Sequence, residues 1–197
     1  MLDELKEVIN PDIIIPYDDT NRRLLIKEDG ADSKLKKLYI DYVPVNSLAF
    51  TLDHQPGGHE NLRFKQLSSY VNIANNKGVN KGCDLVIVWK DEELEQINVL
   101  IFDLKSDKPK ASETKKQLNN SEVFVKYLLE MTAVHYSLNL GKVKFKQAIA
   151  TTDSRALRKG VTYRPSQPER STRSYTIESV TNKQNQTGRV AFPRLVR

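Results

Sequence analysis

Hydrophobic positions in the middle of the chain change their spacing several times, and each change predicts a new element. Residues 84–90 and 97–105 are two nearly continuous apolar runs, rich in Val, Ile, Phe and Trp, and the polar segment 91–96 separates them. Short apolar runs without alternation are typical of strands that are covered on both faces. The pattern therefore predicts a buried β-hairpin over residues 84–105.

Helical spacing flanks this hairpin on both sides. Apolar residues recur at intervals of three and four over about residues 60–76 and again within residues 112–140, which places each set on one face of a helix. In the second helix we expect an interruption at residues 119–121, where a serine can cap a new segment. His135 falls on the apolar stripe of that segment, so it is expected in the core.

Shorter elements are expected toward both ends of the chain. A short helix opens the sequence, and residues 37–43 and 47–52 have the composition of short strands. Residues 143–151 alternate before they become fully apolar, which predicts another strand. Near the C-terminus we expect residues 175–180 to pair with residues 188–192 as a β-hairpin.

The order of the central elements predicts the fold class. From residue 60 to residue 151 the order is helix, strand, strand, helix, strand. Because the last strand follows a helical crossover, it should run parallel to one of the hairpin strands. We therefore expect an α/β fold in which helices flank a mixed sheet. Residues 1–153 would form this domain, with its core over about residues 60–151, and residues 154–197 would form a basic C-terminal extension.

Composition limits the class of protein. The 197 residues are 39% hydrophobic and contain one cysteine, Cys83. One cysteine excludes an intrachain disulfide framework and a multi-cysteine zinc site, so we expect Cys83 to serve in packing. No apolar run approaches the roughly 18 residues of a membrane helix. The acidic N-terminus lacks the features of a signal peptide. We therefore expect a cytoplasmic protein without a membrane partner.

The net charge of +6 is distributed unevenly. Residues 154–197 contain ten Lys or Arg and two acids, whereas residues 1–153 contain 21 basic and 23 acidic side chains. A basic segment suits contact with nucleic-acid phosphates. A solvated tail without such a role is the alternative. The candidates for phosphate contact are Arg155, Arg158, Lys159, Arg164, Arg170 and Arg173.

The predicted hairpin brings chemically useful side chains to one end. Asp84 begins its first strand and Asp103 lies near the end of its second, so an antiparallel pairing places the two carboxylates together. Lys105 follows two residues later and projects from the same face as Asp103. The carbonyl of Leu104 is a further oxygen ligand. Mg²⁺ prefers such hard oxygen ligands, usually one or two carboxylates completed by water and phosphate.

Two further features point to phosphodiester hydrolysis. A lysine beside a metal-held water can orient it or take its proton, and it can stabilise the charge of the pentacovalent transition state. Glu60 lies four residues before Phe64, so its carboxylate leans along the inward face of the first predicted helix. Such a carboxylate calls for a partner, and the acids of the hairpin are candidates.

This arrangement resembles the PD-(D/E)xK phosphodiesterase superfamily, which includes restriction endonucleases. In that resemblance Asp84 matches the first acid, Asp103 the second acid and Lys105 the lysine. Glu60 is similar to an additional acid on the preceding helix, and Gln117 to a supporting glutamine on the following one. The resemblance implies a restriction-endonuclease-like αββαβ core with Mg²⁺ or Mn²⁺ at Asp84, Asp103, Leu104 and Glu60. It also implies hydrolysis of DNA phosphodiester bonds, with endonuclease activity favoured.

The sequence departs from the family pattern in places and leaves two other classes open. Cys83 replaces the proline of the motif, the second acid is Asp where Glu is commoner, and Ser121 stands where RecB-like members carry tyrosine after Gln117. The first alternative is a non-catalytic nucleic-acid-binding protein on a nuclease-derived fold. The second is a small structural or interaction protein with a basic tail. A homodimer would supply the two active sites needed to cut both strands of a duplex.

Overall fold

The structure is a computed structural model that describes residues 1–28, 33–53, 67–68, 77–105, 111–152, 175–180 and 186–197. The elements before the central hairpin are α1 (Leu2–Val8), the 3₁₀ helix η1 (Pro11–Ile13), β1 (Tyr17–Asp18), β2 (Arg23–Lys27), β3 (Lys37–Asp41) and β4 (Leu48–Phe50). They are followed by β5 (Leu85–Asp91), β6 (Gln96–Lys105), α2 (Ala111–Tyr136), β7 (Lys142–Thr151), β8 (Thr176–Ser179), β9 (Thr187–Ala191) and α4 (Phe192–Leu195).

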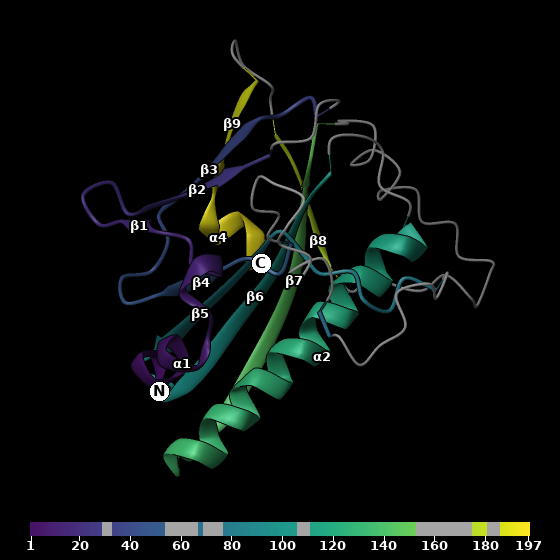
Figure 1. Ribbon diagram of the computed structural model, residues 1–197. Helices are drawn as coiled ribbons and strands as arrows, with labels where there is room; N and C mark the ends of the chain where they lie inside the picture. The colour runs from purple at the N-terminus through teal and green to yellow at the C-terminus, as the bar shows by residue number, and fades with distance from the viewer. Residues whose placement is uncertain (29–32, 54–66, 69–76, 106–110, 153–174, 181–185) are drawn as a thin grey trace, which may run out of the picture.

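These elements form an α/β fold with two mixed sheets (Figure 1). The smaller sheet has the order β1-β2-β3-β9, and the larger has the order β4-β5-β6-β7-β8. In the smaller sheet only the pairing of β3 with β9 is parallel. In the larger sheet β4, β5 and β6 are antiparallel neighbours, whereas β6, β7 and β8 are parallel neighbours. The expected α/β class with a mixed sheet is therefore confirmed.

The central hairpin and its crossover agree with the sequence prediction. β5 and β6 pair antiparallel, from Leu85 opposite Phe102 to Asp91 opposite Gln96. The chain then passes through α2 and returns as β7, which runs parallel to β6 along its whole length. Of the predicted helix over about residues 60–76, the structure describes Leu67 and Ser68, which are not helical, and the other positions lie outside the described residues.

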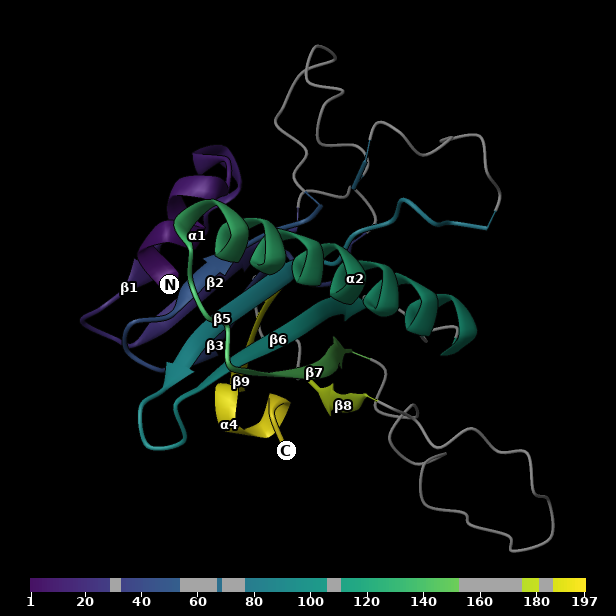
Figure 2. The same ribbon diagram turned by 90° about the horizontal axis from the view of Figure 1, so that it is seen from below.

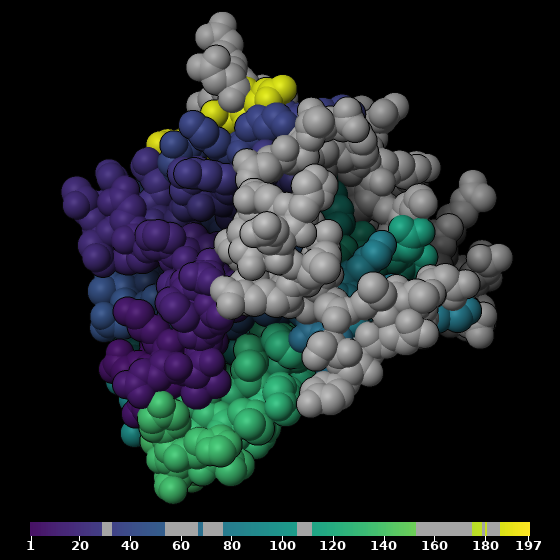
Figure 3. Space-filling view, viewed as in Figure 1, coloured from purple at the N-terminus to yellow at the C-terminus, as the bar shows by residue number. Residues whose placement is uncertain are grey.

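Apolar side chains cover β5 and β6 on both faces, as their continuous apolar runs indicated. One core cluster lies between the two sheets and includes Leu100 and Phe102 of β6. The other lies between the larger sheet and the helices and includes Val99 and Ile101 of β6. Figure 2 shows α2 across one face of the larger sheet and α4 on the opposite side. In Figure 3 the N-terminal segment lies against α2, where the hydroxyl of Tyr136 donates to Glu7 Oε2 at 2.7 Å.

Two expectations for α2 are wrong. The helix runs without interruption, because the buried Ser121 does not cap a new segment but donates its hydroxyl to the carbonyl of Gln117 at 3.0 Å. His135 is exposed. The buried face is centred on Val125, Leu129 and Thr132, one position later than the stripe that contains His135. Its fully buried residues are Leu118, Ser121, Val125, Leu129 and Thr132.

The predicted C-terminal hairpin does not form. β8 pairs parallel with β7, and β9 pairs parallel with β3 in the other sheet. Each segment forms the edge strand of a different sheet. Next to β8, Val180 N–H donates to the carbonyl of Thr151 at 2.9 Å. A Cβ on Gly188 would lie 2.3 Å from Val180 Cγ1, so this glycine allows β9 to pass close to the end of β8. Within the described residues no helix is both long and apolar enough to cross a membrane.

Candidate active site

Strand pairing places the acids of the predicted site at one end of the larger sheet. Leu85 stands opposite Phe102, so the next positions outward are Asp84 on one side and Asp103 on the other. Alternate residues of β6 face the same side, and Ile101, which precedes Asp103 by two positions, packs in the core cluster beneath α2. Asp103 and Lys105 therefore project toward α2.

Asp84 is fixed by the backbone of the neighbouring strand. Its Oδ2 atom accepts a hydrogen bond from the N–H of Leu104 at 2.5 Å. The N–H and C=O of one strand residue point to the same side. The carbonyl of Leu104 is therefore directed toward the side where Asp84 lies, which is where the sequence analysis expected a carbonyl ligand.

Asp103 and Lys105 form an ion pair inside the site. Lys105 Nζ lies 2.5 Å from Asp103 Oδ2, and the Asp103 side chain is 1% exposed against 28% for that of Lys105. The carboxylate is therefore withdrawn from solvent, whereas the ammonium group stays within reach of a ligand.

Gln117 of α2 connects the helix to both members of this ion pair. Its Oε1 accepts from Lys105 Nζ at 2.9 Å, and its Nε2 lies 3.2 Å from Asp103 Oδ1. The same Nε2 donates to the carbonyl of Gly82 at 2.6 Å, just before Asp84 in the chain. One side chain thus orients the lysine, the second acid and the segment that enters β5.

The two carboxyl groups resist ionisation. Burial, followed by repulsion from Asp103, holds the pKa of Asp84 well above its ordinary value. Burial also raises the pKa of Asp103, although Lys105 opposes that shift. Burial alone would lower the pKa of Lys105, but Asp103 and Asp84 outweigh it and leave that pKa above the ordinary value. The site therefore holds a firmly protonated ammonium group beside two crowded carboxyls.

Asp53 is a third acid near the site, and its sequence context alone does not predict this position. Its charge raises the pKa of both Asp84 and Asp103. β4 runs antiparallel to β5, with Phe50 opposite Val86, so the chain leaving β4 arrives where β5 begins. An acid at the end of a predicted strand was the available signal, but only the pairing of β4 with β5 places it beside the hairpin.

The described side chains fit a divalent cation that keeps much of its own water. No three His, Cys, Asp or Glu side chains gather as a ready cage within the described part of the chain. Mg²⁺ does not require one, since it is usually held by one or two carboxylates plus water and phosphate. Asp103 Oδ2 is buried and has the ammonium group of Lys105 as its ion-pair partner. A cation between Asp84 and Asp103 would relieve the repulsion between their carboxylates.

The structure thus brings together five of the residues singled out from sequence, namely Asp84, Asp103, Leu104, Lys105 and Gln117. Glu60 and the six basic residues of the tail lie outside the described residues. Cys83 is buried in the core cluster beneath α2, which confirms its packing role. Burial raises the pKa of its thiol to about 12, so it is not an activated nucleophile.

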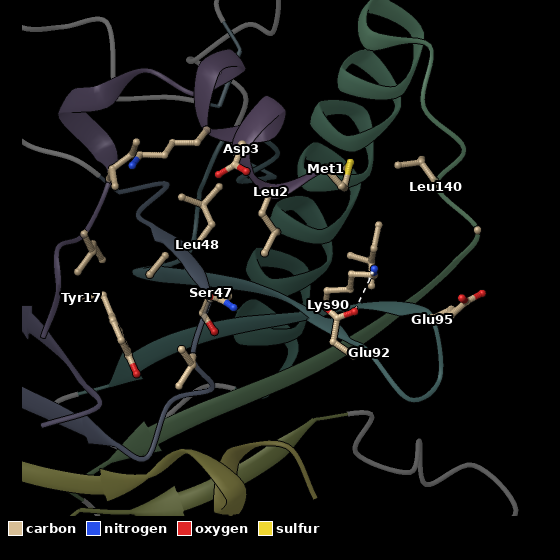
Figure 4. Close-up of a pocket in the computed structure, with 18 of the residues that line it drawn as sticks. Met1, Leu2, Asp3, Tyr17, Ser47, Leu48, Lys90, Glu92, Glu95 and Leu140 are labelled. Carbon is tan, nitrogen blue, oxygen red and sulfur yellow. Dashed lines mark ion pairs between the residues drawn. The ribbon is translucent and has the colours of Figure 1, made fainter. Parts of the chain in front are cut away.

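A cavity beside α1 is remote from these acids. It has a volume of about 1000 Å³ and lies at the far end of β5 and β6, next to α1 (Figure 4). Lys90 and Glu92 form an ion pair of 3.2 Å on its wall. None of the five residues of the candidate site lines it.

Comparison of the chain with protein-family models, with curated proteins and with solved structures finds no match.

Proposed function

We propose that the protein is a metal-dependent nuclease that hydrolyses DNA phosphodiester bonds at the end of the central hairpin. The proposal rests on one observation. Asp84, Asp103 and Lys105 lie together at one end of β5 and β6, where the two carboxyls repel each other and the lysine is protonated. Paired carboxylates beside an ammonium group suit the binding of a divalent cation next to a phosphate.

Each residue has a separate role in this proposal. Mg²⁺ or Mn²⁺ supplies Lewis-acid stabilisation of the phosphoryl oxygens when bound. Asp84, Asp103 and the Leu104 carbonyl hold the cation. Lys105 stabilises charge on the phosphoryl group and orients the attacking water or takes its proton.

The architecture supports the same proposal. The succession of β5, β6, α2 and β7, with β7 parallel to β6, agrees with the last four elements of the restriction-endonuclease-like αββαβ core. The contacts of Gln117 to both Lys105 and Asp103 suit the role of the supporting glutamine that the resemblance implies. DNA is favoured as substrate because the resemblance is to DNA-cleaving enzymes and the chain is basic, with a net charge of +6. Cleavage of both strands by one site each would require a homodimer.

A cleavage assay tests the proposal directly. The wild type is incubated with supercoiled plasmid, linear duplex and single-stranded DNA in Mg²⁺, in Mn²⁺ and in EDTA. We expect cleavage that needs the metal and that is lost in Asp103→Asn and Lys105→Ala. Lys142→Ala, at the exposed start of β7, is the matched control and should cleave like the wild type.

Two results would overturn the proposal. One is cleavage that Asp103→Asn and Lys105→Ala retain at the wild-type rate. The other is the absence of cleavage by folded protein in either metal on every substrate. If that inactive protein still bound DNA, the non-catalytic binding protein would replace the nuclease as the better assignment.

A further inference from the structure

A second cavity adjoins the candidate site on the side of Gln117. Its volume is about 650 Å³, and it lies between the segment that precedes β5 and the first turns of α2. It is separate from the larger cavity beside α1, with which it shares no lining residue. The residues that line it are Lys77, Gly78, Lys81, Ser112, Glu113, Lys116 and Gln117. We call it the lysine pocket.

The charge of this pocket is positive. Three exposed lysines and one glutamate line it, which leaves an excess of cationic groups. Lysine is a compact, flexible point charge that suits phosphate without imposing a planar geometry. The lining therefore favours a ligand that carries several anionic groups. Lysine contacts to the phosphates of a nucleic acid, for example, do not depend on its base edges.

Hydrogen bonds hold the two walls of the pocket together. Asn120 of α2 donates its Nδ2 to the carbonyl of Gly78 at 2.8 Å. Lys81 N–H approaches the same carbonyl at 3.3 Å. Gly78 has a φ of +72°, which favours glycine, and the stem of Lys81 passes 3.6 Å from the position that a Cβ would occupy there. The loop backbone at Gly78, between Lys77 and Lys81, is thereby held against α2.

Gln117 forms a wall of the pocket and is also part of the candidate site. Its side chain contacts Lys105 and Asp103, so the pocket opens next to the place where the scissile phosphate would sit. Phosphates of one strand follow each other at about 3.4 Å along a duplex axis. A strand with one phosphate at the acids therefore has further phosphates close by, and Lys116, which directly precedes Gln117 on α2, is placed to meet one of them.

We propose that the lysine pocket binds the sugar-phosphate backbone of the substrate strand, next to the bond that is cleaved, through Lys77, Lys81 and Lys116. This rests on the proposed function, because the acids define which phosphate is cleaved. The pocket gives the strand a direction across the site and holds it without regard to base sequence. Its volume exceeds what one phosphate ion requires and falls in the range of ligand pockets, about 300–1,000 Å³.

A salt titration of DNA binding tests this. Labelled duplex and single-stranded oligonucleotides are bound in EDTA, which prevents cleavage, over a series of salt concentrations. The variant Lys81→Gln/Lys116→Gln removes two of the proposed contacts. The matched control Lys90→Gln/Lys142→Gln removes the same net charge at the opposite end of β5 and β7. Thermal melts establish that both variants fold.

We expect a loss confined to the pocket variant. The slope of log affinity against log salt should become shallower by about 1.8 on duplex, and by about 1.4 on single strands. At 0.15 M salt this corresponds to about 30-fold weaker duplex binding. The control should keep the wild-type slope. In the cleavage assay the pocket variant should raise KM with little change in kcat, because these contacts are equally strong before and during the reaction.

The outcomes separate this inference from the proposed function. Equal slopes for the pocket variant and the control overturn the pocket inference, whether or not the protein cleaves DNA. Displacement of the oligonucleotide by inorganic phosphate at an equal concentration of phosphate groups also overturns it, since the pocket would then be a site for free anions. The protein could also fail to cleave DNA while the slope of log affinity against log salt still becomes shallower in the pocket variant alone. That result would support the binding site and contradict only the proposed nuclease activity.

Discussion

The Oδ2 atom of Asp84 accepts a hydrogen bond of 2.5 Å from the N–H of Leu104, the residue that directly follows Asp103. The first acid is therefore positioned by the main chain of the strand that carries the second. Since a buried backbone donor needs a partner, the same contact that gathers the acids also completes the edge of the hairpin. Stability and site geometry are coupled through this bond.

Replacing Asp84 with asparagine should stabilise the fold at neutral pH. The amide oxygen can still accept from Leu104, but the buried charge is gone. Because the pKa of Asp84 is raised in the folded state, the folded protein holds this proton to higher pH than the unfolded chain. Its free energy of unfolding therefore falls as the pH rises above the ordinary carboxyl value of 3.8 and through the folded pKa. We expect Asp84→Asn to gain about 0.5–2 kcal/mol at pH 7.

Urea unfolding of both proteins at a series of pH values from acid to neutral checks this. The gain should shrink toward acid, where the carboxyl of the wild type becomes protonated. A variant that is less stable than the wild type at neutral pH would contradict the cost of burying the Asp84 charge.

Divalent cations should stabilise the wild type against heat. A cation that binds the folded state at 100 times its Kd adds about 2.7 kcal/mol. The double variant Asp84→Asn/Asp103→Asn should show no such rise in Tm with Mg²⁺ or Mn²⁺. Because protons compete for carboxyls of raised pKa, the rise in Tm of the wild type should grow with pH. An equal rise in both proteins would place the cation elsewhere.

Gln117 should act as a positioning residue. Gln117→Leu removes its bonds to Lys105, to Asp103 and to the carbonyl of Gly82. Loss of a residue that orients such a site typically costs about 10–100-fold in activity or metal affinity. We expect kcat to fall within that range and the pH profile to shift, since Lys105 loses a partner. An unchanged pH profile together with a lowered Tm would indicate a purely structural role.

Gly82 should not tolerate a side chain. A Cβ at this position would lie 2.4 Å from the carbonyl oxygen of Leu52, which is backbone and cannot swing away. We expect Gly82→Ala to lose about 1–3 kcal/mol of stability. It should also weaken metal binding, because Gly82 accepts from Gln117 and directly precedes the acid-bearing segment. Chemical denaturation with and without Mn²⁺ measures both effects, and an alanine variant that matches the wild type would contradict the close approach.

Cys83 should be unreactive in the folded protein. Its thiol is fully buried, and its pKa of about 12 leaves it protonated at neutral and mildly alkaline pH. A thiol reagent at pH 8 should modify it only after denaturation. Cys83→Ala should retain metal-dependent cleavage if the proposed function holds. Rapid modification of the native protein would show that this strand end opens readily.

The central hairpin and its crossover could be predicted because their sequence signals are local. β5 and β6 are continuous apolar runs joined by a charged turn, and the two-residue spacing of Asp103 and Lys105 fixes a shared face. Antiparallel pairing then brings Asp84 to the same end. These inferences need no knowledge of the remaining chain.

The wrong predictions concern features that depend on tertiary contacts, namely which face of α2 is buried and which strands β8 and β9 join. Ser121 and Thr132 look polar in sequence, yet both are buried because their hydroxyls donate to carbonyls one turn earlier in α2, at 3.0 and 2.8 Å. This moves the buried face by one position and exposes His135. Likewise, β8 and β9 resemble the two strands of a hairpin, and their own sequences do not indicate that they pair with β7 and β3.

The parallel pairing of β3 with β9 has a consequence for the growing polypeptide. Lys37 meets Thr187 and Asp41 meets Ala191, so the smaller sheet lacks β9 until residues 187–191 have left the ribosome. During that time β3, with its inward-facing Leu38 and Ile40, presents an open edge that other strands can occupy. Pairings so distant along the chain also form slowly. During synthesis, the nascent chain therefore exposes a strand edge to which a chaperone that covers exposed strands could bind.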